Sequence, residues 1–144
     1  MEIFTENLKD LKNESNKSLR QLAAESGVSA MQYSRYLNGS IPTIDIILKI
    51  AKFFDCSLDY LFGLSNERKV KKYTTYNYDI SQFLINYEKL LNQNGLIHYK
   101  FIKTIGYDES IIRHWKSGST PRLDIIYYIA KNLDGSIDDL IGRY

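Results

Sequence analysis

The sequence predicts an all-α protein of two tandem helical domains, and a long internal repeat is the first observation behind this prediction. Residues 22–63 align without a gap with residues 101–142, at an offset of 79, and 15 of the 42 aligned pairs are identical. Unrelated sequences of ordinary composition match at about one position in sixteen. The only two prolines of the chain, Pro42 and Pro121, occupy the same place in the repeat. We therefore expect one duplicated fold.

Apolar residues that recur at helical spacing are the second observation. Phe4, Leu8 and Leu11 form one stripe, and a second stripe after Pro42 consists of Ile44, Ile47, Leu48, Ala51 and Phe54. Steps of three and four residues predict amphipathic helices. Only residues 70–78 show any alternation of the kind that is typical of a strand.

Capping signals are the third observation, and they predict where the helices begin and end. Ser18 with Gln21, and Ser29 with Gln32, match the capping box, in which the serine oxygen accepts from a free amide and the glutamine reaches back. Gly27 predicts a left-handed residue that ends the intervening helix. The remaining signals are Gly39 as a stop and Ser57 as a cap in the first copy, with Asp108 and Ser136 as caps and Gly106 and Gly118 as stops in the second.

These signals divide the chain into a domain over residues 1–64, a linker over 65–79 and a second, divergent domain over 80–144. The linker holds Arg68, Lys69, Lys71 and Lys72 against Glu67, which is typical of a solvated connector. Three linker tyrosines, Tyr73, Tyr76 and Tyr78, have no predicted core role. The sequence leaves open whether they wrap around the domains or form a short strand.

Composition limits the possible functions. The 19 basic and 17 acidic residues give a formal charge of +2, which excludes a histone-like polycation but not a sequence-specific DNA-binding protein. The single cysteine, Cys56, cannot form a disulfide within one chain, is expected to be a buried thiol and fits a reducing cytoplasm. His98 and His114 lack metal-ligand spacing, and no apolar run approaches the length of a membrane span. We expect a cytoplasmic protein with no cofactor, no metal and no membrane contact.

Residues 18–37 have the design of two helices joined by a tight turn. A helix of about three turns fits the major groove of B-DNA, where each base pair presents a distinct pattern of donors and acceptors. A preceding helix that packs across its back holds such a helix in place. We expect one set to face the core, namely Leu22, Ala23, Val28, Tyr33 and Tyr36. The set expected to face outward is Ala30, Met31, Gln32, Ser34 and Arg35.

The motifs Leu22-Ala23, Gly27-Val28-Ser29, Tyr36-Leu37-Asn38-Gly39, Pro42 and the tail from Ile47 to Leu61 resemble the helix-turn-helix family of the phage lambda and 434 repressors and Cro. The resemblance covers Phe4 to Gly63 well and Phe83 to Gly142 less well. It implies a compact domain of about five helices whose third helix reads bases. It also implies a partner, double-stranded DNA.

Position by position, the resemblance implies base contacts by Ala30, Met31 and Arg35, with Gln32 nearby. Arg35 can donate two hydrogen bonds to a guanine edge, and Ala30 or Met31 can contact a thymine methyl. Leu19 stands where the family often has a phosphate-binding glutamine. The remaining phosphate candidates in the first copy are therefore Lys17, Ser18, Arg20, Ser34 and Ser40.

In the second copy the matching outward positions are Glu109, Ser110, Ile111, Arg113 and His114, of which all but Ile111 are candidate base contacts. Lys116 and Arg122 are its phosphate candidates. Trp115 replaces Tyr36 and is expected in the core, and Ile102, larger than the residue the family prefers, predicts a wider helix crossing. An exposed Ile111 is unusual on a groove-reading face and offers an apolar surface for pairing.

We expect a sequence-specific transcriptional regulator, a repressor of phage or mobile-element type that acts by occupying its operator, because we find no effector domain in this sequence. The alternative is a protein-binding inhibitor or antitoxin-like module that reuses the fold. An enzyme is not expected, since no nucleophile triad, paired carboxylates or phosphate loop is found. The chain is expected to act as a homodimer, and a single chain whose two domains read adjacent half-sites across the 15-residue linker is the rival arrangement.

Overall fold

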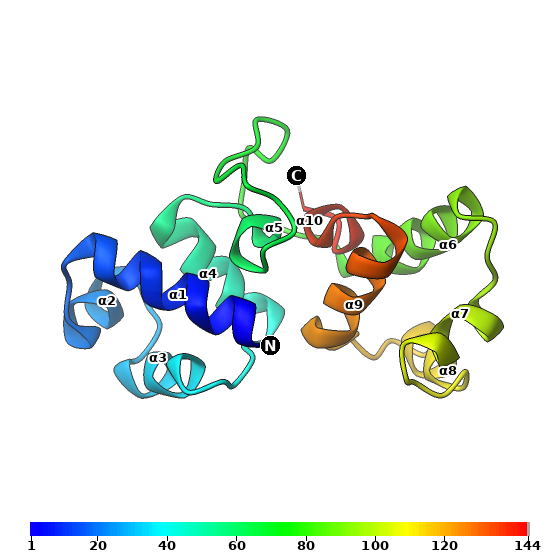
Figure 1. Cartoon of the computed structure of the whole chain (residues 1–144), viewed down its shortest axis with the longest axis horizontal. Coiled ribbons are helices and arrows are strands. Elements are labelled where there is room, and N and C mark those ends of the chain that lie inside the picture. Colours follow the sequence, from blue (N-terminus) through cyan, green and yellow to red (C-terminus); the bar gives the residue numbers. More distant parts are fainter. Residues whose placement is uncertain (144) are drawn as a thin grey trace. The chain divides into compact units, whose positions relative to one another are not determined.

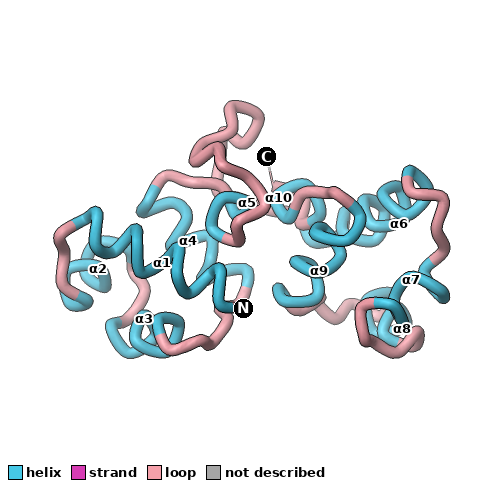
Figure 2. The backbone as a smooth tube through the Cα atoms, in the orientation of Figure 1, coloured by secondary structure: helices cyan, strands magenta, loops and turns pink. Residues whose placement is uncertain are grey.

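A computed structural model describes residues 1–143, and in this part of the chain every regular element is helical (Figures 1 and 2). The chain separates into two compact units, residues 1–77 and residues 78–143. The first unit contains α1 (Glu2–Ser15), α2 (Leu19–Ser26), α3 (Ala30–Leu37), α4 (Ile44–Phe54) and α5 (Leu58–Leu61). The second contains a 3-10 helix, η1 (Ile80–Gln82), and α6 (Phe83–Gln93), α7 (His98–Thr104), α8 (Ile111–Lys116), α9 (Leu123–Leu133) and α10 (Ile137–Leu140).

The apolar stripes predicted from the sequence form the core of the first unit. Phe4, Leu8 and Leu11 of α1 are buried, and the rings of Phe4 and Phe62 stack with centroids 5.0 Å apart. The stripe on α4 is also buried. In this unit α2 packs against α3 and α4, and α1 packs against α3 and α5. Helices α1 and α4 therefore hold α2 and α3 in place on the side that faces the core.

In the second unit, aromatic side chains occupy the core between α6, α7 and α8. Trp115 is buried, as predicted, and its ring meets the rings of Phe83 and Tyr87 edge to face. Ile102 is completely buried, and α7 and α8 approach each other less extensively than α2 and α3 do. The larger Ile102 and the shorter helices are both consistent with this smaller contact.

Most capping predictions are confirmed. Ser18 and Ser29 each form a full capping box, and Ser57 and Ser136 accept from the amides of Tyr60 and Asp139. Gly27 ends α2 in the left-handed conformation, at φ +78°. Asp108 is an exception and is discussed with the second unit below.

The segment predicted to be a solvated linker belongs to the first unit as far as Asn77. The amide of Ser57 donates to the carbonyl of Arg68 at 2.8 Å, and the Arg68 guanidinium donates to the carbonyl of Phe54 at 2.8 Å. Lys69 pairs with Asp55 at 2.9 Å, and the Tyr76 hydroxyl donates to the same carboxylate at 2.7 Å. These contacts attach most of the segment to the end of α4, while its charged side chains from Glu67 to Lys69 remain exposed.

The linker tyrosines do not form a strand within the described residues. Tyr73 is buried, whereas Tyr76 and Tyr78 are half-buried. The pKa of the Asp55 carboxyl lies below its ordinary value, mainly because Lys69 donates a hydrogen bond to it and also because Tyr76 does. Asp55 is thus one of the anchors of the segment, together with the contacts of Arg68.

Candidate nucleic-acid interface

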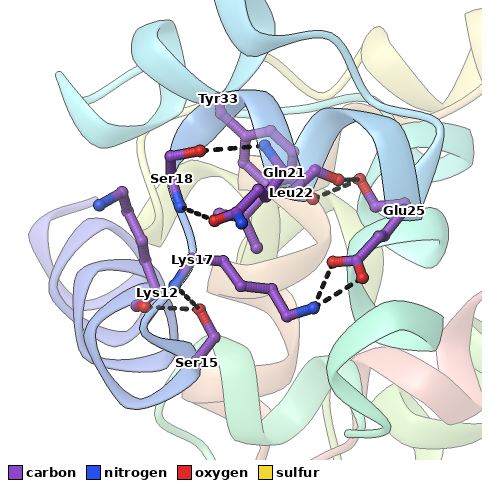
Figure 3. A network of polar contacts seen from close by, with 9 residues as sticks. Lys12, Ser15, Lys17, Ser18, Gln21, Leu22, Glu25 and Tyr33 are labelled. Carbon is purple, nitrogen blue, oxygen red and sulfur yellow. Dashed lines mark hydrogen bonds and ion pairs between the residues drawn. The ribbon is translucent and has the colours of Figure 1, made fainter.

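The turn between α2 and α3 is fixed by local hydrogen bonds at both helix starts. The Ser18 amide donates to Gln21 at 2.8 Å, and the Gln21 amide donates back to the Ser18 hydroxyl at 3.2 Å (Figure 3). Ser29 and Gln32 repeat this exchange at the start of α3, at 3.0 and 3.1 Å. Because each box pairs two otherwise free groups, the first turns of both helices are well defined.

A partly buried chain of hydrogen bonds joins α3 to the end of α2. The Tyr33 hydroxyl donates to Ser26 Oγ at 2.7 Å, and Ser26 Oγ donates to the carbonyl of Leu22 at 2.6 Å. Burial raises the pKa of Tyr33, although the Ser26 hydrogen bond partly opposes this shift. Leu22, Val28, Tyr33 and Tyr36 are all buried, as predicted, and Ala23 is half-buried. The core-facing side of α3 is therefore rigidly held.

The opposite side of α3 is open. Ala30, Met31, Ser34 and Arg35 are exposed, and 73% of Met31 remains accessible, the largest exposed fraction of any large apolar side chain among the described residues. Gln32 is half-buried, and its carbonyl oxygen is engaged by Ser29, which leaves only its amide nitrogen for an outside acceptor. A long donor and apolar side chains thus share one exposed helix face.

The start of α2 carries the predicted phosphate candidates of the first copy. Arg20 and Ser18 are exposed, and neither Arg20 nor Arg35 forms an ion pair with any residue between 1 and 143. Lys17 is half-buried and pairs with Glu25 at 2.7 Å (Figure 3), so its charge is already partly offset. Ser34 and Ser40 are exposed on and just after α3. At the start of α2, Arg20 is therefore better suited to bind a phosphate than Lys17, because its charge is not offset by an ion pair.

The second unit departs from the first at the start of α8. Counted by the repeat offset, α8 would begin at Glu109, but it begins at Ile111 and its N-cap residue, Ser110, forms no side-chain cap. Asp108 accepts from the amide of Ser110 at 2.8 Å instead of capping the helix, so the prediction of Asp108 as a cap is wrong. Ile111 stands where Gln32 completes the capping box in the first copy, and an apolar side chain cannot reach back to the N-cap amide.

His98 contacts the segment just before α8. One ring nitrogen of His98 lies 2.7 Å from the Tyr87 hydroxyl, and the other lies 2.9 Å from the carbonyl oxygen of Glu109. The equivalent residues of the first copy, Leu8, Leu19 and Ala30, cannot form this bridge. The signal in the sequence was that Tyr87 and His98, which are polar, replace Leu8 and Leu19 of the first copy. Sequence reasoning missed it because it weighed His98 only as a metal ligand.

The predicted outward positions of the second copy are split by the structure. Arg113, His114, Lys116 and Arg122 are exposed, although Arg122 pairs with Asp124. Glu109, Ser110 and Ile111 are half-buried, so the prediction that these three face outward is corrected. Glu109 and Ser110 also precede the helix instead of lying on its first turn, where the base contacts of a recognition helix are concentrated.

Two other expectations concern ligands and membranes. Cys56 is a buried thiol outside any disulfide among the described residues, as predicted. Between residues 1 and 143 no cluster of three His, Cys, Asp or Glu side chains is placed to hold a metal ion. The same residues contain no helix that is both long and apolar enough to cross a bilayer.

A short helix, a glycine turn and a second helix with one buried and one exposed face define a helix-turn-helix. Residues 8–61 match the family model described as helix-turn-helix, so the first unit contains a domain of this family. The match runs from the middle of α1 to the end of α5. No curated protein and no solved structure matches the chain. Domains of this family are typical of DNA-binding transcription regulators.

Proposed function

We propose that the first unit binds double-stranded DNA in a sequence-specific manner, with α3 in the major groove, and that the chain represses transcription by occupying an operator of a phage or mobile element. The observation that carries this proposal is that one face of α3 is exposed while the opposite face is packed against the core. Met31 and Arg35 are exposed, while Tyr33 and Tyr36 of the same helix are buried. A groove-reading helix needs both properties.

The roles proposed for individual residues follow from their chemistry. Arg35 has a planar guanidinium that matches the two acceptors on a guanine edge. Ala30 and Met31 suit contact with a thymine methyl, and the amide nitrogen of Gln32 can donate to a base or to a phosphate. We assign contacts with backbone phosphates to Arg20, Ser18 and Ser40, which are exposed, and Lys17 can join them if a phosphate replaces Glu25 as its partner.

We propose a weaker role in DNA binding for the second unit. Arg113, His114, Lys116 and Arg122 keep one side of it basic. Against base reading, α8 begins two residues later than its counterpart α3, and the carboxylate of Glu109 near a phosphate would be repelled. The second unit fits a pairing role better, so we propose a homodimer in which two first units read two half-sites.

A protein-binding function is the second candidate, and the exposed apolar residues of the second unit favour it. Ile85, Ile97 and Tyr99 are 61%, 58% and 51% exposed. An inhibitor or antitoxin-like protein would use such a surface on a partner and would show no preference among DNA sequences.

Retention of sheared genomic DNA by the purified full chain, followed by sequencing, separates the two candidates. The regulator predicts a shared motif among the retained fragments, with less retention as salt rises. Retention without a motif, or no retention at low salt, would contradict sequence-specific binding. Arg35→Ala is the matched variant, since it removes the proposed base contact and leaves the buried face of α3 intact.

A further inference from the structure

An open groove on the second unit runs between α6 and the start of α10, and we call it the α6–α10 groove. Its volume is about 600 Å³. Leu90 and Gln93 of α6 line one side, and Asp134, Gly135 and Ser136, which connect α9 to α10, line the other. None of the residues that line it is among the proposed DNA contacts. The groove therefore needs a separate explanation.

The first unit has a counterpart of this groove, and one hydrogen bond shows the correspondence. Asn86 donates to the carbonyl of Asp139 at 2.8 Å, and Asn7 donates to the carbonyl of Tyr60 at 3.2 Å. Both donors and both acceptors are related by the offset of 79. Each bond links the long first α-helix of a unit to its short last one. The helices that border the groove are thus arranged alike in the two units.

In the first unit, residues 65–77 of the chain itself occupy this place. The amide of Ser57 donates to the carbonyl of Arg68 at 2.8 Å, and Lys69 pairs with Asp55 at 2.9 Å. Counted by the offset of 79, the two groove residues that receive these contacts correspond to Ser136 and Asp134 of the second unit. A non-helical segment that carries basic side chains is therefore what this kind of groove holds in the first unit.

Exposure shows that the lining is covered in one unit and open in the other. Leu11, Cys56 and Ser57 of the first unit have 2%, 1% and 1% of their surface accessible. Their counterparts in the second unit are half-buried, namely Leu90, Gly135 and Ser136. The α6–α10 groove thus has room for an occupant like the one that covers its counterpart.

The carboxylate of Asp134 is available to a cation. Asp134 and Asp55 have the same left-handed backbone, with φ +52° and +51°, and each ends the long helix before it. Asp55 accepts from Lys69 and Tyr76. The carboxylate of Asp134 is exposed and has no hydrogen bond or ion pair with any residue between 1 and 143. A lysine ammonium is the group that the corresponding carboxylate binds in the first unit.

The two grooves differ at the end near α6, and this difference narrows what the second one can bind. In the first unit the Arg68 guanidinium contacts Glu14 and the carbonyl of Phe54. In the second unit Gln93 replaces the acid, and Asn94 donates to the corresponding carbonyl at 3.1 Å. The α6–α10 groove therefore keeps the site for a lysine but not the site for an arginine.

We propose that the α6–α10 groove binds a lysine-bearing, non-helical segment of a partner protein, with the lysine paired to Asp134. Two acids, Asp134 and Asp139, and one base, Lys89, line the groove, so its charge favours a basic ligand over a nucleic acid. The segment of this chain that has the required character, residues 65–77, is already held by the first unit. The proposal is independent of DNA binding, because the first unit supplies only the pattern of contacts.

An NMR titration of the ¹⁵N-labelled full chain with a synthetic peptide of residues 65–77 tests the proposal. The amide signals of Gln93, Asp134, Gly135 and Ser136 are expected to shift and to saturate. Asp134→Asn, which the left-handed conformation tolerates, should weaken binding roughly two- to fivefold, as for an exposed ion pair. A peptide with Lys69→Ala should bind more weakly by the same factor, and the two changes together should cost no more than either alone.

Glu88→Gln is the matched control variant. It removes one exposed carboxylate from α6 at a position that does not line the groove. It should bind the peptide as wild type does, which separates a contact at Asp134 from general attraction between a basic peptide and an acidic residue. The spectrum of each variant also shows whether it is folded.

Three results would overturn the proposal: no shift at the groove amides in excess peptide, shifts confined to the first unit, or an Asp134→Asn chain that binds as tightly as wild type. Groove signals that move when the chain alone is concentrated would assign the groove to a second copy, and would overturn it as well. DNA does not enter the measurement. A chain that binds the peptide but no DNA would therefore contradict only the proposed function.

Discussion

The Tyr33 hydroxyl donates to Ser26 Oγ over 2.7 Å and thereby connects α3 to the last turn of α2. Tyr33 is completely buried, and Ser26 passes the connection on to the carbonyl of Leu22. The Ser26 hydroxyl also accepts from the amide of Val28 at 3.3 Å, so the Ser26 side chain is bonded to residues on both sides of the Gly27 turn. The orientation of α3 relative to α2 depends on this small network.

Ser26→Ala should destabilise the protein by about 1–3 kcal/mol, because it leaves the buried Tyr33 hydroxyl without its acceptor. Tyr33→Phe removes the donor and leaves no hydroxyl in need of an acceptor, so it should cost less, about 0.5–1.5 kcal/mol. Urea unfolding of wild type, both single variants and the double variant gives the coupling free energy between Ser26 and Tyr33. In the Ser26→Ala background, Tyr33→Phe should be nearly neutral, and costs that simply add would contradict the proposed network.

Asp55→Asn should release the segment between Arg68 and Tyr76 from the end of α4. Asp55 accepts from Lys69 and Tyr76, and it has φ +51°, a left-handed conformation that asparagine tolerates well. Limited trypsin digestion should therefore cleave at Arg68, Lys69 and Lys71 several-fold faster in the variant. Asp10→Asn, on the exposed side of α1, is the control and should digest like wild type.

The same anchor should depend on pH. Its hydrogen bonds lower the pKa of Asp55, so its contribution is present above the ordinary aspartate pKa of about 3.9 and is lost as the pH falls through the lowered value. Heteronuclear NOE values for residues 68–76 should stay high at neutral pH and fall only in acid. Values that are already low at pH 7 would show that the segment is not anchored.

DNA affinity should fall steeply with salt even though the formal charge is only +2. A unit that contacts about four phosphates should give a log–log slope near −3.6, and Arg20→Ala should make this slope less steep by about 0.9. Titrations at several salt concentrations measure both. A slope near zero for wild type would indicate that DNA is not the partner.

Local signals made the first unit predictable. The boxes at Ser18 and Ser29 involve residues three apart, and the Gly27 stop lies next to the helix it ends, so the sequence alone predicted the turn and the two faces of α3. The apolar spacing on α1 and α4 predicted their buried stripes for the same reason.

Contacts between distant residues made the rest unpredictable. The attachment of residues 65–77 depends on Asp55, which lies 14 and 21 positions before Lys69 and Tyr76. The late start of α8 coincides with the His98 contact to the Glu109 carbonyl, across 11 positions. Periodicity and capping patterns carry no information on such pairs. They therefore gave no sign of how the segment is attached, and they predicted a cap at Asp108 and an outward-facing Ile111, both of which the structure corrects.

If α3 reads bases through Arg35, the affinity of Arg35→Ala for the DNA motif that the wild-type chain enriches is the most direct measurement. The variant should lose about 1–3 kcal/mol on that motif and should no longer discriminate at one base pair. Lys49→Ala, an exposed cation on α4, serves as the matched control and should keep both affinity and preference. If Arg35→Ala binds the motif as tightly and as selectively as wild type, α3 does not read DNA in the way described.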